Sequence, residues 1–128
     1  MLKLASNPGS VSQIEPFVNQ LVHRYQLSPD RQCDILVSLT EAVTNAIVHG
    51  NGQEENKTVR IKMKREKDVL ALRVSDEGRG FDYKNLPDPT QPENICRCGG
   101  RGVYLMRQLA DNIRFFNNGS TVEMRFKL

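Results

Sequence analysis

The stretch Glu41-Ala-Val-Thr-Asn45-Ala-Ile-Val-His49-Gly50-Asn51 is the most informative part of this chain. Residues four apart lie on the same side of a helix, so Glu41 and Asn45 are neighbours on one face. A carboxylate can take a proton or hold a water, and an amide oxygen suits Mg²⁺, which prefers oxygen ligands. The run therefore predicts a polar site on the last turns of a helix.

The helix that carries this run has a clear start. Ser28-Pro29-Asp30 supplies a capping serine, a proline at the first helical position and an acid that faces the helix dipole. We expect the helix to end near His49, with Gly50 as its left-handed stop. At about 100° per residue, its apolar side chains form one arc that excludes Glu41 and Asn45. That arc consists of Ile35, Leu39, Ala42, Val43, Ala46 and Ile47.

Apolar and polar residues alternate with a period of two in several segments, which predicts strands that are packed on one face. Glu66-Lys67-Asp68 is the expected turn between two of them, and Asn118-Gly119 is a favoured hairpin turn between the last two. The expected strands cover residues 2–6, 59–64, 70–74, 112–117 and 120–128.

Two further helices are expected. One begins at a Ser10 cap and ends near Tyr25, and the other runs from Gly102 to about Asp111. Taken together, the elements predict an α+β two-layer sandwich, in which a mostly antiparallel sheet of four to five strands has about three helices on one face.

Length and composition favour one soluble domain over residues 1–128, because 38% apolar and 26% charged residues are ordinary values. A net charge of +3 is too small to indicate nucleic acid by itself. No apolar stretch approaches the ~18 residues that cross a bilayer, and the N-terminus lacks the apolar core of a signal peptide. Three cysteines do not suggest a disulfide framework, so we expect a reducing, cytoplasmic setting.

Two glycine-rich segments extend the polar site, namely Asp76-Glu-Gly78-Arg-Gly80 and Gly99-Gly100-Arg101-Gly102. Asp76 ends an apolar strand, and one polar group on the floor of an apolar pocket gives base specificity. Glycines at the start of a helix offer free N–H groups to phosphate. The irregular stretch at about residues 82–99 has the length that is typical of a lid. The three segments therefore predict a nucleotide site.

In this order the segments resemble the N, G1 and G2 boxes of the Bergerat-fold (histidine-kinase-like) ATPases. The closer resemblance is to the bacterial anti-sigma-factor serine/threonine kinases, whose string Glu-Ala-Val-x-Asn-Ala-x-x-His-Gly matches residues 41–50. The resemblance covers nearly the whole chain. It implies transfer of the ATP γ-phosphate to a serine of an anti-anti-sigma (STAS) protein, sequestration of a sigma factor and a homodimer, without direct contact with nucleic acid or membrane.

The resemblance also implies roles for individual residues. Asn45 would hold Mg²⁺, and Glu41 would act as general base on the attacking hydroxyl. Asp76 would accept a hydrogen bond from the exocyclic amine of adenine, assisted by the hydroxyl of Ser120 or, as a substitute, of Thr121. The other residues implied in nucleotide binding are His49, Gly78, Gly80, Arg97, Gly100, Arg101 and Gly102.

The expected lid departs from the family pattern, because Cys96-Arg97-Cys98 stands where the group often has Arg or Ser before its glycines. The contact with the γ-phosphate therefore stays open between Arg97 and Arg101. Two cysteines without a third and fourth ligand do not make a structural zinc site. The basic row over residues 60–67 alternates and carries no interleaved aromatics, so we interpret it as the solvated side of a strand rather than a nucleic-acid site.

Plainer interpretations compete with each motif. An isolated Glu-x-x-x-Asn is typical of an exposed helix surface, His49-Gly50 is typical of a helix end, and a glycine turn often follows a strand. The main alternative function is a nucleotide-gated binding module without significant kinase activity, which an intact Glu41 disfavours. Another is the catalytic domain of a split histidine kinase, with His23 and His49 as the only phosphoacceptor candidates. A small-molecule kinase would need a second substrate lobe.

Overall fold

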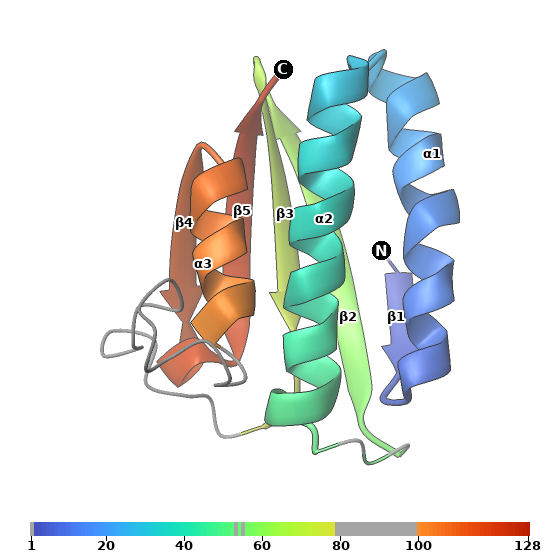
Figure 1. Cartoon of the computed structure of the whole chain (residues 1–128), viewed down its shortest axis with the longest axis vertical. Helices are drawn as coiled ribbons and strands as arrows, with labels where there is room; N and C mark the ends of the chain where they lie inside the picture. Colours follow the sequence, from blue (N-terminus) through green and yellow to red (C-terminus); the bar gives the residue numbers. More distant parts are fainter. Residues whose placement is uncertain (1, 53, 55, 79–99) are drawn as a thin grey trace.

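The computed structural model describes residues 2–52, 54, 56–78 and 100–128. Figure 1 shows two layers, in which α1, α2 and α3 cover one face of an antiparallel sheet. In the described part of the chain the strand order is β1-β2-β3-β5-β4. The strands are β1 (Leu2–Ala5), β2 (Thr58–Glu66), β3 (Val69–Ser75), β4 (Asn112–Phe116) and β5 (Thr121–Lys127). The α-helices are α1 (Ile14–Tyr25), α2 (Pro29–Asn45) and α3 (Gly100–Leu109). The predicted α+β sandwich is confirmed.

The core lies between the two layers, and the expected periodicities account for it. The six side chains of the predicted apolar arc of α2 are all buried. Alternate residues of the two central strands meet them from the sheet, because side chains of a strand point to opposite faces in turn. The buried apolar side chains at these alternate positions are Leu70, Leu72 and Val74 of β3 and Val122, Met124 and Phe126 of β5.

The two N-terminal helices begin in different ways. The Ser28 hydroxyl accepts a hydrogen bond from the Arg31 N–H at 3.2 Å, so the predicted cap of α2 is confirmed. The predicted start of the first helix at Ser10 is wrong. A 3₁₀ segment over Pro8–Gln13 precedes α1, and the buried Ser10 lies inside it. Pro8, which opens this segment, lacks an N–H and favours a helical start ahead of Ser10.

The end of α2 also differs from the prediction. A turn of π-helix over Ala46–Gly50 follows Asn45, and the Asn51 N–H donates to the Ala46 carbonyl at 2.8 Å. The residue with a left-handed backbone is Gly52, with φ of 60°, so the expected left-handed stop at Gly50 is wrong. π-Helical turns of this kind often occur at functional sites.

One of the two expected hairpin turns is confirmed. Glu66 pairs with Val69, so a two-residue turn joins β2 and β3, with Lys67 at φ of 53°. The turn between β4 and β5 is longer than expected, because residues 117–120 separate the paired Phe116 and Thr121. Asn117 and Gly119 both have positive φ there, and Asn117 lies outside the expected two-residue Asn118-Gly119 turn.

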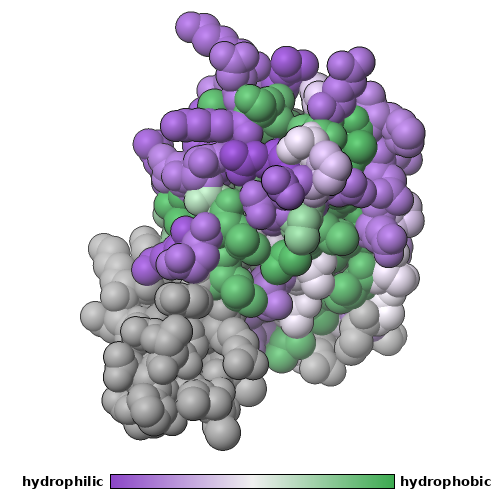
Figure 2. All heavy atoms as spheres, turned by 45° about the horizontal axis from the view of Figure 1, so that its top comes forward, coloured by the Kyte–Doolittle hydropathy of each residue, from purple (hydrophilic) through white to green (hydrophobic). Residues whose placement is uncertain are grey.

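The molecular surface is mixed in polarity. Figure 2 shows hydrophobic atoms reaching the surface in patches that hydrophilic side chains surround. Several apolar side chains packed against the core are only partly buried, among them Phe17, Val22 and Leu36. Among the described residues, none of the helices combines the length and the hydropathy that crossing a bilayer requires.

Candidate nucleotide site

The described parts of the three predicted segments lie at one end of the molecule. In Figure 1 the C-terminal end of α2, the C-terminal end of β3 and the N-terminal end of α3 all reach the lower edge of the sandwich. The antiparallel sheet and the α2–α3 packing bring them there, although long stretches of chain separate them. The fold therefore places the polar run of α2 beside the described parts of the glycine-rich segments, residues 76–78 and the start of α3.

Asp76, directly after β3, lies against the backbone of Gly50. A Cβ atom built on Gly50 would lie 2.3 Å from both Cγ and Oδ2 of the Asp76 carboxyl. A side chain at position 50 would therefore occupy the place of the carboxyl group. This close approach explains why position 50 holds a glycine even though its backbone is not left-handed.

Gly78 is packed against the same turn. A Cβ atom on Gly78 would lie 2.0 Å from the Gly50 carbonyl oxygen and 2.6 Å from its carbonyl carbon. Backbone atoms cannot rotate away as the tip of a flexible side chain can, so this contact requires glycine. Gly50, Asp76 and Gly78 thus form one tightly packed cradle between the end of α2 and the end of β3.

The Asp76 carboxyl is anchored on one side. Its Oδ1 accepts a hydrogen bond from the Gly78 N–H at 2.7 Å, and the Asp76 N–H donates to the Ser120 carbonyl at 2.9 Å. Burial raises the pKa of Asp76 above its ordinary value, and this rise outweighs the opposing effects of the Gly78 N–H and of Lys57. The remaining oxygen, Oδ2, has no hydrogen-bond donor among the described residues.

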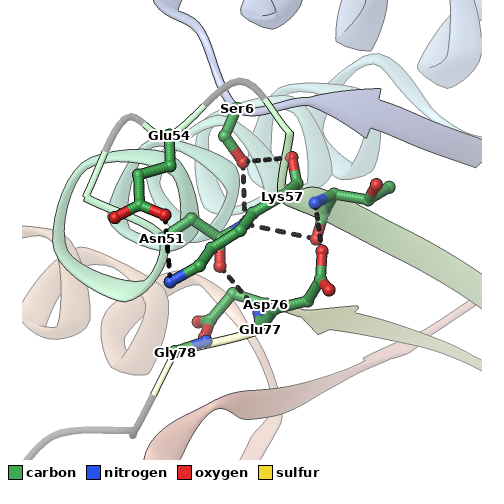
Figure 3. Close-up of polar contacts among 8 residues, drawn as sticks. Ser6, Asn51, Glu54, Lys57, Asp76, Glu77 and Gly78 are labelled. Atoms are coloured by element: carbon green, nitrogen blue, oxygen red, sulfur yellow. Dashed lines mark hydrogen bonds and ion pairs between the residues drawn. The ribbon is translucent and has the colours of Figure 1, made fainter.

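Asn51 holds the segments around Asp76 together (Figure 3). Its side chain is 1% exposed. The amide nitrogen donates to the Ser6 hydroxyl at 2.7 Å and to the Thr58 carbonyl at 3.2 Å. The amide oxygen accepts from the Glu77 N–H at 2.7 Å. One buried side chain therefore links the ends of β1 and β2 to the residue that follows Asp76.

Two further contacts close this network. The Ser6 hydroxyl donates to the Lys57 carbonyl at 2.8 Å, and the Glu77 carboxylate accepts from the Thr58 N–H. The Lys57 ammonium lies 3.4 Å from the Glu54 carboxylate (Figure 3). Residues 76–78 are thus fixed from the β1–β2 side of the sheet as well as from α2.

Ser6, Asn51, Thr58 and Glu77 were not predicted as site residues. Asn51-Gly52 after a helix is typical of turn chemistry, and Asn51 does lie next to the left-handed Gly52. That pattern does not indicate that the side chain would be buried. Its three partners lie at the ends of three different strands, β1, β2 and β3. Only the folded chain therefore shows that Asn51 links these strand ends.

The predicted residues of α2 lie on its last turns. Glu41 and Asn45 are half-buried, and neither belongs to the buried arc of the helix. His49 is exposed on the π-helical turn. α2 packs beside α3, which begins with the predicted phosphate segment, Gly100 to Gly102. The first N–H groups of a helix have no partner within it, so they are available to an anion at this end.

The other predicted residues divide into two groups. The Ser120 carbonyl lies beside Asp76, while its hydroxyl donates to the Asn117 carbonyl at 2.9 Å. The Thr121 hydroxyl instead donates to the Ser75 hydroxyl at 3.1 Å. The residues outside the described part of the chain are Gly80, Arg97, Cys96 and Cys98, together with the expected lid over residues 82–99 and the side chain of Arg101.

Comparison with known proteins identifies the class. The model of the histidine kinase-like ATPase domain matches residues 4–126, and the chain therefore belongs to this family. The chain is 30% identical to the serine-protein kinase RsbW of Bacillus subtilis (strain 168), with 96% of this chain and 81% of that protein covered. It is 27% identical to the RsbW of Listeria monocytogenes (strain EGD-e), with 96% and 83% covered. The predicted membership of the Bergerat-fold kinases is confirmed.

A solved structure supports the fold. The histidine kinase domain of the blue-light activated histidine kinase EL346 of Erythrobacter litoralis superposes with a TM-score of 0.58 at 19% identity. The match covers 94% of this chain and 60% of that one. At this identity the likeness concerns the arrangement of helices and strands alone.

Proposed function

We propose that this chain is an ATP-dependent serine/threonine protein kinase that is also an anti-sigma factor. It would phosphorylate a serine of an anti-anti-sigma (STAS) protein and sequester a sigma factor. The observation that carries this proposal is the cradle of Gly50, Asp76 and Gly78, which anchors one oxygen of a half-buried carboxyl and leaves the other as an acceptor. The similarity to proteins named serine-protein kinase adds the reaction class.

The cradle fits an adenine base. An exocyclic amine is a hydrogen-bond donor, and Asp76 Oδ2 is an acceptor in a partly desolvated position, where a hydrogen bond is stronger than in water. The absence of Cβ atoms at Gly50 and Gly78 keeps the carboxyl in its place. A base that presents a carbonyl at the same edge would face an oxygen instead of a donor, so the site would prefer adenine to guanine.

The polar face of α2 fits the phosphoryl end of the nucleotide. The amide oxygen of Asn45 is the type of donor that Mg²⁺ accepts, and we propose that it holds the ion. Bound Mg²⁺ would offset the negative charge of the triphosphate. The N–H groups at the start of α3, from Gly100 to Gly102, would bind phosphate oxygens. His49, Gly80 and either Arg97 or Arg101 complete the proposed nucleotide contacts.

Glu41 lies one helical turn before Asn45 on the same face, which suits a general base. Its carboxylate would accept the proton of the serine hydroxyl as the oxygen attacks the γ-phosphorus. The bond from the γ-phosphorus to the bridging oxygen of ADP breaks, and ADP carries away that electron pair. Ser120 would assist adenine recognition, and we also propose a cytoplasmic homodimer, as the family resemblance implies.

The proposal is tested by comparing Glu41→Gln with Glu15→Gln, an exposed acid on α1 that serves as control. Glu41→Gln should keep ATP affinity within about twofold and reduce phosphate transfer to a purified STAS protein by roughly 10²–10⁴-fold. Calorimetry gives the affinity, and mass spectrometry gives the rate and the acid stability of the product. Phosphate transfer at the normal rate by Glu41→Gln refutes the role of Glu41 as general base. An acid-labile phosphorylated product indicates a histidine kinase. The absence of ATP binding to the unaltered chain refutes the nucleotide site.

A further inference from the structure

The sheet face turned away from the helices carries a groove of about 590 Å³. It extends over β2, β3, β5 and β4, and it shares no lining residue with the candidate nucleotide site. Five of its lining residues are basic and two are acidic, so the groove alone carries a formal charge of +3. Its lining residues are Lys62, Met63, Lys64, Glu66, Ala71, Arg73, Arg114, Phe116, Glu123 and Arg125.

The strand register arranges these charges in rows. Lys62 is paired with Arg73, Arg73 with Glu123 and Glu123 with Arg114, so one row crosses four strands. Neighbouring strands are about 4.8 Å apart, which makes this row roughly 14 Å long. In the next row, the small side chain of Ala71 lies between Lys64 and Arg125, and it leaves the hollow open.

Two carboxylates hold two of the three arginines of the groove, Arg73 and Arg125, in place. The buried Glu123 accepts a hydrogen bond from Arg73 Nε at 3.4 Å, and its Oε1 lies 3.9 Å from Arg125 Nη1. Arg125 Nη2 also donates to Glu66 Oε2 at 3.0 Å, and the Arg73 guanidinium lies 4.7 Å from the centre of the Phe116 ring. Guanidinium groups held in this way lose less conformational entropy when they bind a further carboxylate.

Of the remaining cations of the groove, Lys64 lies 3.1 Å from the Glu66 carboxylate, and the other two are unmatched among the described residues. Lys62 and Arg114 are exposed, and within the described part of the chain no carboxylate lies within ion-pairing distance of either. Arg60, on the same face of β2 as Lys62, is exposed as well. Like charges that are clustered without counterions repel one another, and an anionic partner would relieve that repulsion.

We propose that this groove binds an acidic segment of a partner protein. An extended segment with a carboxylate at every second residue repeats at about 6.7 Å, the spacing of Lys62 and Lys64 along β2. Nucleic acid fits less well, because Glu66 and Glu123 lie among the cations and the Phe116 ring is covered by Arg73. A second copy of the chain fits less well too, since it would bring two groups of cations together. The site requires neither ATP nor Glu41.

The test uses a double variant, Lys62→Gln with Arg114→Gln, which removes two positive charges and no ion pair among the described residues. The control is Gln13→Glu with Gln20→Glu. Gln13 is the N-cap residue of α1 and Gln20 lies within α1, and both are exposed. This control also lowers the net charge of the chain by two. The probes are a labelled peptide of alternating glutamate and threonine and a single-stranded oligonucleotide of equal charge. Fluorescence anisotropy at low and physiological salt measures both, and sedimentation measures the oligomeric state.

We expect the peptide to bind more tightly than the oligonucleotide, the double variant to weaken peptide binding at least about tenfold, and the control to change it less than about twofold. Equal losses in variant and control would show that only the net charge matters and would refute the groove. Tighter binding of the oligonucleotide would assign the face to nucleic acid. A change in oligomeric state caused by the double variant alone would assign it to contacts between copies.

Discussion

Replacing Asn51 by alanine should weaken the fold and displace Asp76 together. The side chain is buried and makes three hydrogen bonds, to the Ser6 hydroxyl, the Thr58 carbonyl and the Glu77 N–H. Alanine removes both the amide donor and the amide acceptor, so each of these partners loses a bond inside the protein. Because Glu77 directly follows Asp76, the position of the Asp76 carboxyl depends on the third of these bonds.

The size of the effect follows from the number of bonds. At about 1 kcal/mol for each hydrogen bond, the loss is roughly 3 kcal/mol of unfolding free energy. With about 2.1 cal/mol/K of unfolding entropy per residue, a chain of 128 residues should melt about 10 °C lower. A surface substitution in the same loop, Asn56→Ala, should stay within about 0.5 kcal/mol and serves as control.

Two assays separate the structural effect from the positioning effect. Urea unfolding gives the free energy, and calorimetry with ATP and GTP at a temperature where both variants are folded gives affinity and base preference. Asn51→Asp is the second variant, since it retains the acceptor for the Glu77 N–H and loses the donor to Ser6 and Thr58. It should retain more of the preference for adenine than Asn51→Ala does.

Two results would refute this reasoning. An Asn51→Ala protein within 1 kcal/mol of the wild type would show that water replaces the lost bonds without loss of stability. A destabilised protein with unchanged ATP affinity and base preference would show that Asp76 keeps its position without Asn51. In that case Gly50 and Gly78 alone would define the cradle.

Three further substitutions test other parts of the fold and site. Gly78→Ala forces a Cβ atom against the Gly50 carbonyl, and we expect a loss of roughly 1–3 kcal/mol in urea unfolding together with loss of ATP binding, whereas an unchanged protein would contradict the close packing. Asp76→Asn removes a carboxyl whose pKa burial raises above 3.8. The folded state binds this proton more tightly than the unfolded state does, so the wild type loses stability as the pH rises through and above 3.8. The variant should therefore be the more stable protein at pH 7, with a difference that shrinks toward acid pH in thermal melts, and it should not bind ATP. Ser28→Ala removes the cap of α2 and should lower the stability by about 1 kcal/mol by calorimetry, and an unchanged melting temperature would exclude that bond in solution.

Local chemistry and periodicity were sufficient to predict the architecture. Ser28-Pro29 marks the start of α2 because its capping oxygen and missing N–H satisfy requirements of the first turn alone. The buried arc of α2 and the alternation in β2, β3 and β5 follow from repeats of 3.6 and 2 residues, which do not depend on distant parts of the chain. The two-residue turn at Lys67 has the same local origin.

Several features of the candidate site could not be predicted, because they depend on contacts between distant segments. Gly50 was expected to supply a left-handed backbone, yet its lack of a side chain matters because Asp76, 26 residues later, fills that space. Asn51 was part of the informative run, and its role appeared only when Ser6, Thr58 and Glu77 were placed around it.

The amino-acid sequence alone determines the class of fold, the order of its elements and the three segments that resemble a nucleotide site, since each is encoded by residue types at short spacing. The tertiary structure decides which atoms of those segments touch, because the sheet register and the π-helical turn after Asn45 set distances of a few ångströms. It also decides that Lys62, Arg73 and Arg114 form one row of charge, since they come from three strands that only the folded sheet places side by side.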